Sequence, residues 1–364
     1  MPIVIFTVVN DLTYDQRMHR ICNSLARNGY DVLLIGRKLK SSIPLHPEIF
    51  MQKRLHSIFT RGKLFYIEYN LRLFFLLLTK KFHIVCGIDL DTILPCYFIS
   101  VMRNKTCVYD AHELFPEVPE VVRRPAIQSL WRSVEKFSIL RIKNCYTVSQ
   151  SIADHFEKNY KRKFEVIRNM PVKTDEGLRK EIHLNPPVVL YQGTLNEGRG
   201  IEQMIDVMQY LDCRLILAGE GDLAASLIKT GERLKLEQKI IFAGMKTAAE
   251  LRELTLQSTV GINLLENTGL SYYYSLANKF FDYAMAGIPQ ITMNFPEYRI
   301  LNKQFEVAIL IDDLKTETLL RAIHQLMDEK DFYIRLRENC LRAREEWNWQ
   351  KEEIKLLSFY HGLQ

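Results

Sequence analysis

The residue types and spacing at the start of one helix in the C-terminal half suit the binding of an anionic ligand. Ser275 has the type and position to cap a helix that Gly287 would end. Asn278 and Lys279 would then lie in the first turn, where backbone amides and a cation together bind phosphate. Asp282, one turn further on, could accept hydrogen bonds from both hydroxyls of a ribose. We therefore predict a site for a nucleotide diphosphate, and we prefer it to the alternative of a solvated helix face.

A glycine-rich turn at residues 191–200 offers a second phosphate contact, because it follows a strand-like run and leads into a helix. Gly193 lets the backbone approach a ligand closely, and Thr194 lies beside it. Arg199 presents a forked donor to phosphate oxygens. No Gly-Lys-Ser/Thr follows, so the turn is not a Walker loop. A generic glycine-rich turn stays the alternative.

Polar side chains also follow strand-like runs of the N-terminal half. His112 comes just after the run Thr106–Tyr109, at the carboxyl end of a strand, where open α/β sheets bind ligands. It could orient a sugar hydroxyl, or it could equally be a histidine hydrogen-bonded within its own loop. We assign contacts with a second substrate to three acidic residues of this half: Asp11, Asp91 and Glu113.

Two further segments imitate sites of different chemistry. Gly219–Ala224 follows a strand and opens a helix, as a dinucleotide fingerprint does, but no acidic residue ends the next strand-like run, Lys239–Ala243. We therefore reject a nicotinamide enzyme. Asp89 and Asp91 have the spacing of a metal-binding pair, but no third carboxylate or histidine is clearly offered nearby. We expect loop capping or substrate contacts there, and no metal.

Alternating strand-like and helical segments must position these residues. Helical spacing runs from Tyr14 to Leu25 and stops at Gly29. The expected strands of the first half are Ile3–Val9, Asp31–Gly36, His83–Gly87, Thr106–Tyr109, Cys145–Val148 and Phe164–Ile167. The pattern then restarts with Val188–Tyr191, Arg214–Ala218, Lys239–Ala243, Thr259–Leu265, Gln290–Met293 and Val307–Ile311. This alternation predicts an α/β protein of two tandem Rossmann-like domains, each built on a doubly wound parallel sheet.

The boundary between the two domains is expected in Arg168–Pro187, a proline-containing charged stretch that we interpret as a linker. We place the first domain at residues 1–170 and the second at 171–348. The C-terminal helix, 349–364, has an amphipathic pattern with no strand after it, so we expect it to pack on the first domain. With 364 residues the chain is long enough for two hydrophobic cores.

The composition is that of a folded protein, with 47% hydrophobic and 25% charged residues. A net charge of +6 suits anionic small molecules or a negatively charged membrane face. The seven cysteines are scattered, without the spacing of a redox or zinc motif, which predicts free thiols in a reducing compartment. We see no signal peptide and no spanning segment, and we expect a cytoplasmic protein.

The stretch 61–81 is basic at its ends and apolar inside. Our preferred interpretation is a helix that covers one face of a sheet. The alternative is peripheral contact with the inner face of a membrane that carries a lipid-linked acceptor.

In this order and spacing, the motifs resemble the GT-B glycosyltransferases, specifically the retaining enzymes of glycosyltransferase family 4. The likeness covers nearly the full length and is specific through the sequence of motifs rather than through any one of them. It is carried by residues 14–18 with Leu25 and 29–32, by 110–113, by 166–171, by 192–200 and by 278–289.

The resemblance implies two domains that face each other across a cleft. It also implies retaining transfer of a hexose-type sugar from a UDP- or GDP-sugar to a glycan or lipid-linked acceptor, in surface polysaccharide biosynthesis. It implies no cofactor or metal, and we expect no nucleic-acid partner. By position, Arg199 and Lys279 would neutralise the departing diphosphate and Asp282 would hold the ribose. His112 would contact the transferred sugar, and Met245 would lie near the base.

The chain departs from the family pattern at several positions. Tyr274 stands where the family has its first glutamate, and Asp282 replaces the second. Arg199 replaces the usual lysine of the phosphate loop, and Thr194 a common arginine. Two alternatives therefore stay open. One is a nucleotide-sugar epimerase of GT-B fold, and the other is a catalytically weak subunit that binds a nucleotide sugar.

Overall fold

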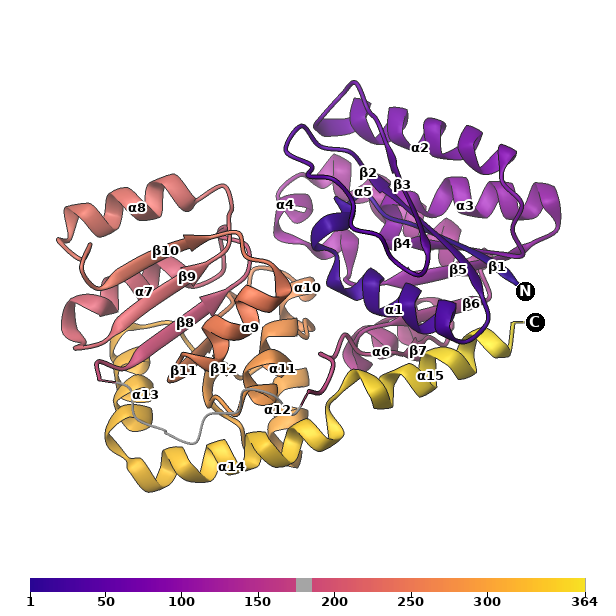
Figure 1. The fold of residues 1–364 in the computed structure, drawn as a ribbon. Helices are drawn as coiled ribbons and strands as arrows, with labels where there is room; N and C mark the ends of the chain where they lie inside the picture. Colours follow the sequence, from indigo (N-terminus) through magenta and orange to yellow (C-terminus); the bar gives the residue numbers. More distant parts are fainter. Residues whose placement is uncertain (175–184, 364) are drawn as a thin grey trace. The chain divides into compact units, whose positions relative to one another are not determined.

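The computed structural model describes residues 1–174 and 185–363, which form two compact units (Figure 1). Unit 1 comprises Met1–Asn169, Gly269–Ser271 and Glu352–Gln364, and unit 2 comprises Met170–Thr268 and Tyr272–Lys351. Of the expected linker, Arg168–Pro187, residues 175–184 lie outside the described residues. Within the described ranges, no helix combines the length and the apolar character needed to cross a bilayer.

Unit 1 contains a parallel sheet of strand order β3-β2-β1-β4-β5-β6-β7. Its strands are β1 (Ile3–Thr7), β2 (Asp31–Arg37), β3 (Met51–Leu55), β4 (Ile84–Ile88), β5 (Thr106–Ala111), β6 (Asn144–Thr147) and β7 (Glu165–Val166). The central strands β1 and β4 are almost entirely apolar, with Thr7 as the polar exception, because helices cover both faces of a parallel sheet.

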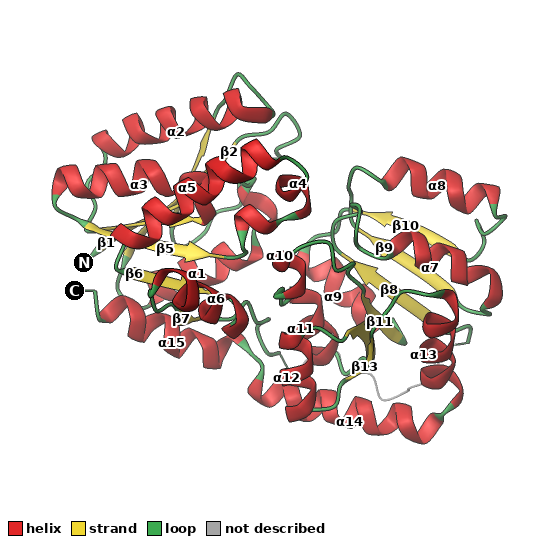
Figure 2. Cartoon of the chain, turned by 180° about the vertical axis from the view of Figure 1, so that it is seen from behind, coloured by secondary structure: helices red, strands yellow, loops and turns green. Residues whose placement is uncertain are grey.

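Helices lie on both faces of this sheet, with α2, α3 and α5 on one face and α1 and α15 on the other (Figures 1 and 2). Helix α6 packs beside α5. The helical elements are η1 (Leu12–Tyr14), α1 (Gln16–Arg27), α2 (Gly62–Thr79), α3 (Asp89–Arg103), η2 (Phe115–Glu117), α4 (Pro119–Val122), α5 (Pro125–Arg141), α6 (Gln150–Tyr160) and α15 (Trp349–His361). From α15, Tyr360 is fully buried with its ring near those of Phe6 and Tyr146, at centroid distances of 5.8 and 6.3 Å.

Unit 2 has the strand order β10-β9-β8-β11-β12-β13, again parallel. The strands are β8 (Val188–Gln192), β9 (Arg214–Ala218), β10 (Ile240–Gly244), β11 (Val260–Asn263), β12 (Gln290–Met293) and β13 (Ala308–Ile311). The helical elements are α7 (Ile201–Val207), η3 (Met208–Tyr210), α8 (Ala224–Arg233), α9 (Ala248–Leu256), α11 (Asn278–Met285), α12 (Pro296–Gln304), α13 (Thr316–Asp328) and α14 (Lys330–Glu346). Of α10 (Leu270–Tyr273), the first two residues belong to unit 1 and the last two to unit 2. Helix α7 packs against α8 and α13, and α11 packs against α9 and α14.

The predicted fold, two Rossmann-like parallel α/β sheets, is confirmed. Strand β3 was not predicted, because its sequence, Met-Gln-Lys-Arg-Leu, is polar, as befits the exposed edge of a sheet. The first helix begins at Gln16 rather than at Tyr14, because the Asp15 side chain accepts a hydrogen bond from the Met18 amide at 3.1 Å and caps it there.

Candidate active site

The sheet of unit 2 changes winding direction between β8 and β11, so the loops that follow these two strands diverge and leave room beyond their carboxyl ends. Arg199 lies in the loop after β8. Lys279 lies in the first turn of α11, between β11 and β12. The topology therefore brings together the two cationic residues that the sequence predicted for one phosphate site.

Lys279 is buried, with only 7% of its surface exposed, and its Nζ lies 3.8 Å from the centroid of the Tyr191 ring. Nζ has no hydrogen-bond partner in the described part of the chain. Burial, and next the nearby charge of Arg199, lower the pKa of Lys279 well below its ordinary value. An unpaired ammonium in this position is poised to gain an anionic partner.

The Arg199 guanidinium lies over the ring of Tyr272, 4.9 Å from its centroid, and its buried Nε lacks a partner among the described residues. Tyr272 and Tyr191 thus flank the two cations with aromatic faces, the surfaces that best tolerate a cation in the absence of a carboxylate. The charge of Arg199 is near enough to lower the pKa of Lys279, so the two cations repel, and a diphosphate between them would relieve that repulsion.

Asp282 lies one turn after Asn278 on α11, and its Oδ2 accepts a hydrogen bond from Gln192 Nε2 at 2.8 Å. The Gln192 Oε1 atom in turn accepts from the Thr255 hydroxyl at 3.0 Å. This chain holds the carboxylate at the end of β8, while Asn278 is exposed. The sequence did not identify Gln192 as the residue that positions Asp282.

The predicted cap at Ser275 is wrong. Helix α11 begins at Asn278 after Ala277, and among the described residues no side chain caps it. Ser275 Oγ instead donates to the Tyr272 carbonyl at 2.7 Å, and the Ala277 amide donates to the Tyr298 hydroxyl at 3.0 Å. The turn is thus closed by one local bond, from Ser275 to Tyr272, and by one tertiary bond, from Ala277 to Tyr298, which sequence spacing does not reveal. The consequence is that Lys279 stands at the very start of the helix.

The glycines of residues 219–221 pack one loop onto another. A Cβ on Gly219 would lie 1.9 Å from the Gly193 carbonyl oxygen, and one on Gly221 would lie 2.4 Å from that of Leu195. The Leu195 amide donates to the Glu220 carbonyl at 2.9 Å. Glycines are therefore needed at positions 219 and 221 so that this segment can pack against the 193–200 loop. This packing explains the glycines without a bound dinucleotide.

The other predicted donor contacts lie at the same edge of the sheet. Gly193 has φ +136° and is exposed, as is Thr194 beside it. Met245 follows β10 and is 51% exposed. Their side chains and backbone are accessible to a ligand at the carboxyl ends of β8 and β10.

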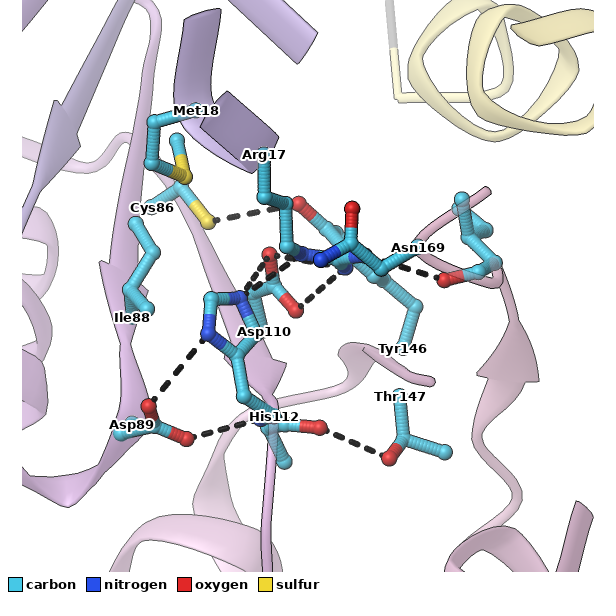
Figure 3. Close-up of polar contacts among 12 residues, drawn as sticks. Arg17, Met18, Cys86, Ile88, Asp89, Asp110, His112, Tyr146, Thr147 and Asn169 are labelled. Atoms are coloured by element: carbon cyan, nitrogen blue, oxygen red, sulfur yellow. Dashed lines mark hydrogen bonds and ion pairs between the residues drawn. The ribbon is translucent and has the colours of Figure 1, made fainter. Parts of the chain in front are cut away.

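In unit 1 the winding direction changes between β1 and β4, and His112 follows the adjacent strand β5. Figure 3 shows His112 beside Asp89 and Asp110. Asp89, at the end of β4, accepts a hydrogen bond from the His112 amide at 2.7 Å, and its other oxygen lies 3.5 Å from His112 Nδ1. Asp110 Oδ2 lies 3.2 Å from His112 Nε2. The imidazole is thus held between two carboxylates and keeps 22% of its surface exposed.

Arg17 completes this network from α1. Its Nη2 donates to both oxygens of Asp110, at 3.0 and 3.3 Å, and its Nε lies 2.8 Å from His112 Nε2. A neutral imidazole accepts from Arg17, whereas an imidazolium pairs with Asp110, since one nitrogen cannot do both. With His112 protonated, two cations balance the two carboxylates of Asp110 and Asp89.

The charges around His112 set its protonation. Burial alone would lower the pKa of His112, but the carboxylates of Asp110 and Asp89 outweigh burial and raise the pKa above its ordinary value. For Asp110, burial would raise the pKa, and the charges of Arg17 and His112 reverse the direction and lower it. The sequence identified His112, but it did not identify Asp110 as its partner, and it could not identify Arg17, which reaches both residues from α1, more than ninety positions away.

Of the predicted acceptor residues, Asp91 and Glu113 are electrostatic neighbours. Burial and then the charges of Asp89 and Glu113 raise the pKa of Asp91 well above its ordinary value. The same two residues, Asp91 and Glu113, also help burial to raise the pKa of Tyr66 to about 12, so this α2 hydroxyl belongs to the same group. Among the described residues, no group of three or more His, Cys, Asp or Glu is arranged to hold a metal ion.

Asp11 stands apart from this acidic group. Its carboxylate accepts hydrogen bonds from the Thr13 amide at 3.0 Å, from Arg54 at 2.6 Å and from the Ser42 hydroxyl. The side chain is only 9% exposed. In this structure Asp11 orders its own loop.

Comparisons with known proteins concern the family and the fold. The model of Glycosyltransferase Family 4 matches residues 16–170, and the model of glycosyl transferases group 1 matches residues 174–343. No curated protein matches the chain by sequence. Sucrose-phosphate synthase from Thermosynechococcus elongatus is similar in structure, with 15% identity, a TM-score of 0.82, and coverage of 100% of this chain and 99% of the other.

Two further solved structures are similar over nearly their whole length. Anabaena HepE in complex with UDP and glucose has 12% identity and a TM-score of 0.76, covering 98% of this chain and 99% of the other. WaaG, a glycosyltransferase involved in lipopolysaccharide biosynthesis, has 14% identity and a TM-score of 0.74, with coverage of 97% and 98%. With a family 4 domain followed by a group 1 domain on two Rossmann-like sheets, the chain belongs to the glycosyltransferases of GT-B fold and is an enzyme of that class.

Proposed function

We propose that this enzyme transfers a hexose-type sugar, with retention of anomeric configuration, from a nucleotide sugar to a glycan or lipid-linked acceptor in surface polysaccharide biosynthesis, on the cytoplasmic side of the membrane. The observation that carries the proposal is the pair of unpartnered cations, Arg199 and Lys279, at the carboxyl edge of the unit 2 sheet. A buried ammonium beside a second cation is costly unless an anion binds there in the working state.

A UDP-sugar is the first donor to test, because structures of Anabaena HepE hold UDP and UDP-glucose. Lys279 and Arg199 would bind the diphosphate, and Gly193 would let backbone amides approach it. Asp282, held by Gln192, would accept hydrogen bonds from the ribose hydroxyls. Met245 would lie beside the base.

In the proposed reaction the bond from the anomeric carbon to the phosphate oxygen breaks while the acceptor hydroxyl attacks from the same face. The hydroxyl proton passes to the departing phosphate oxygen, so the configuration is retained. Lys279 and Arg199 would stabilise the charge that develops on the diphosphate, which is the main catalytic need of this step. Two protein cations would supply the charge for which other enzymes use a divalent metal, so we propose that transfer continues in the presence of EDTA.

Unit 1 would supply contacts with the transferred sugar and the acceptor. His112 is partly exposed and firmly oriented by Asp89 and Asp110, which suits a group that positions a sugar hydroxyl. Glu113 and Asp91 would bind acceptor hydroxyls. Tyr274, in place of the acidic residue of the family, would leave sugar selection to neighbouring groups such as Ser271.

The test begins with a thermal-shift screen of UDP-, GDP- and other nucleotide sugars, because a bound ligand raises the apparent stability. The stabilising donor is then incubated with candidate acceptors, and the anomeric configuration of the product is read by NMR. Arg199→Ala and Lys279→Ala should each lower turnover about a hundredfold or more with the fold intact. The exposed Lys229 offers a control, since Lys229→Ala should transfer normally.

Incubation without an acceptor separates the two alternatives. An epimerised nucleotide sugar in that reaction would show a different activity on the same fold. A donor that binds but is neither hydrolysed nor transferred would indicate a binding subunit. Near-normal transfer by the Arg199 or Lys279 variant would refute the assigned diphosphate site.

A further inference from the structure

Helix α2 has two apolar faces on opposite sides. One face is buried against the sheet of unit 1, where its side chains join a core with Ile5, Leu33 and Val85. The buried stripe consists of Phe65, Tyr69, Leu73 and Leu77. The other stripe is exposed, and each of its members has more than half of its surface accessible: Leu64, Ile67, Leu71 and Phe75.

The exposed stripe is a continuous line along the helix. At about 100° per residue, its four positions fall within roughly 80° of one another and centre on the side opposite the buried stripe. The first and last members are eleven positions apart, which corresponds to about 16 Å of helix. A helix that only covers a sheet has polar residues on this side, so the second stripe is not explained by folding.

Helix α3 extends the apolar surface. It packs directly beside α2, and Arg103 near its end donates hydrogen bonds to the Leu77 and Lys80 carbonyls at the end of α2. Its large exposed apolar side chains are Phe98, Val101 and Met102. We call these three residues and the exposed stripe of α2 the α2–α3 surface.

Basic residues flank the α2–α3 surface. Residues 61–81 contain five basic residues and one acidic residue, a net charge of +4. The acidic one, Glu68, is engaged by the Ile58 and Phe59 amides and by Arg72. The basic residues near the two ends of α2 and the end of α3 are Arg61, Lys63, Lys80, Lys81, Arg103 and Lys105.

We propose that the α2–α3 surface binds an anionic phospholipid bilayer, with its apolar side chains among the acyl chains and its flanking lysines and arginines at the headgroups. The arrangement has both components of interfacial binding, an apolar face and basic residues beside it. A second copy of the chain is a poorer occupant, because a symmetric contact would set each basic flank near its own equivalent.

Membrane binding deepens the proposed function, since it would hold unit 1, the proposed acceptor side, at a lipid surface and so favours a lipid-linked acceptor. That consequence rests on the proposed function, but binding itself does not. The experiment therefore measures binding without a nucleotide sugar. Arg199→Ala, which tests the donor site, should bind vesicles as the parent protein does.

The full chain is sedimented with vesicles of phosphatidylcholine alone and of phosphatidylcholine mixed with phosphatidylglycerol. We expect binding to the anionic vesicles that weakens with salt. Leu71→Ser/Phe75→Ser should lower the partition coefficient about tenfold or more. The matched control is Tyr210→Ser/Ile354→Ser, which removes two apolar side chains that are 64% and 68% exposed elsewhere and should change nothing. Lys80→Gln/Lys81→Gln should weaken binding to the anionic vesicles only.

Three results would overturn the proposal. The parent protein could fail to bind anionic vesicles, or Leu71→Ser/Phe75→Ser could bind them as well as the parent. The parent could instead self-associate without binding vesicles, and lose that association with the same two substitutions, which would assign the surface to a second copy. Transfer to a soluble acceptor should be equal in the parent and the Leu71→Ser/Phe75→Ser variant. A failure of the proposed transfer activity can therefore be distinguished from a failure of membrane binding.

Discussion

Lys279 Nζ lies 3.8 Å from the centroid of the Tyr191 ring. It is also close to Gly193, because a Cβ added to that glycine would lie 3.5 Å from Nζ. The ammonium therefore rests on an aromatic face beside the glycine turn, with no carboxylate to neutralise it in the described residues. A buried ammonium without an anionic partner costs stability, and the cost can be measured.

Lys279→Met should stabilise the donor-free protein and abolish donor binding. Replacing a buried, unpaired charge with an apolar side chain of similar length stabilises by about 1–4 kcal/mol in comparable cases. Thermal unfolding measures the first effect, and calorimetric titration with UDP measures the second. Lys229→Met, on an exposed turn of α8, should leave both unchanged. A less stable Lys279→Met protein would contradict the electrostatic argument.

Donor affinity should fall as the pH rises above the pKa of Lys279 in the free enzyme. Burial and the charge of Arg199 lower that pKa, and a bound diphosphate would raise it again. At a pH between the pKa of the free enzyme and that of the complex, binding therefore takes up a proton. At a pH between the pKa of Lys279 in the folded protein and its ordinary value, the lysine is protonated mainly in the unfolded chain, so the stability of the donor-free protein rises with pH. Calorimetry in buffers of different ionisation enthalpy measures the proton uptake. Lys279→Arg should remove this dependence.

Gly219→Ala should disturb the phosphate loop. Its Cβ would lie 1.9 Å from the Gly193 carbonyl oxygen, and the backbone has φ +150°, so the change should destabilise the protein by more than about 1 kcal/mol and raise the KM for the donor. Gly231→Ala is the matched control, because it lies within α8 with no neighbour closer than 4.0 Å. That substitution should stabilise by about 0.5–1 kcal/mol. Equal effects of the two changes would refute the loop-packing argument.

Arg17→Met should destabilise unit 1 by about 3–5 kcal/mol, because it leaves the buried Asp110 carboxylate without its cation. Arg17→Lys keeps the charge but not the forked donor, and should cost less. Urea unfolding measures both. If Arg17→Met proved as stable as the parent, Asp110 would be neutral in the folded state, contrary to the direction of its pKa.

Asp89→Asn should lower the pKa of His112, because the amide keeps the hydrogen bond to the His112 backbone but removes one of the two carboxylate charges. NMR titration of the imidazole measures the shift. A raised His pKa stabilises the folded state below the ordinary His value, and this contribution is lost as the pH rises through the folded pKa. The variant should therefore lose stability mainly in acid. An unchanged titration would show that Asp110 alone sets the pKa.

Much of the donor side could be predicted from sequence because its residues lie in two short segments at strand ends. In a parallel sheet the carboxyl ends of all strands meet at one edge. Arg199 and Lys279 both follow strands of this sheet, so they must lie at that edge once the strands have been identified. Ser275 was assigned wrongly for a related reason. A serine before a helical pattern usually caps it, but here the Ser275 hydroxyl bonds back to the Tyr272 carbonyl, the Ala277 amide bonds to the distant Tyr298, and the helix starts at Asn278.

The sequence by itself determined the two parallel sheets, the glycine turn and the order of the motifs, because periodicity and turn chemistry are local properties of the chain. Only the tertiary structure decided which groups hold them in place, such as Gln192 on Asp282 or Arg17 on Asp110, since these contacts join residues about ninety positions apart. It also resolved stretch 61–81, whose apolar pattern favoured burial. The sheet covers one side of α2 and leaves the other exposed, and no reading of hydrophobicity along a chain can assign those two sides.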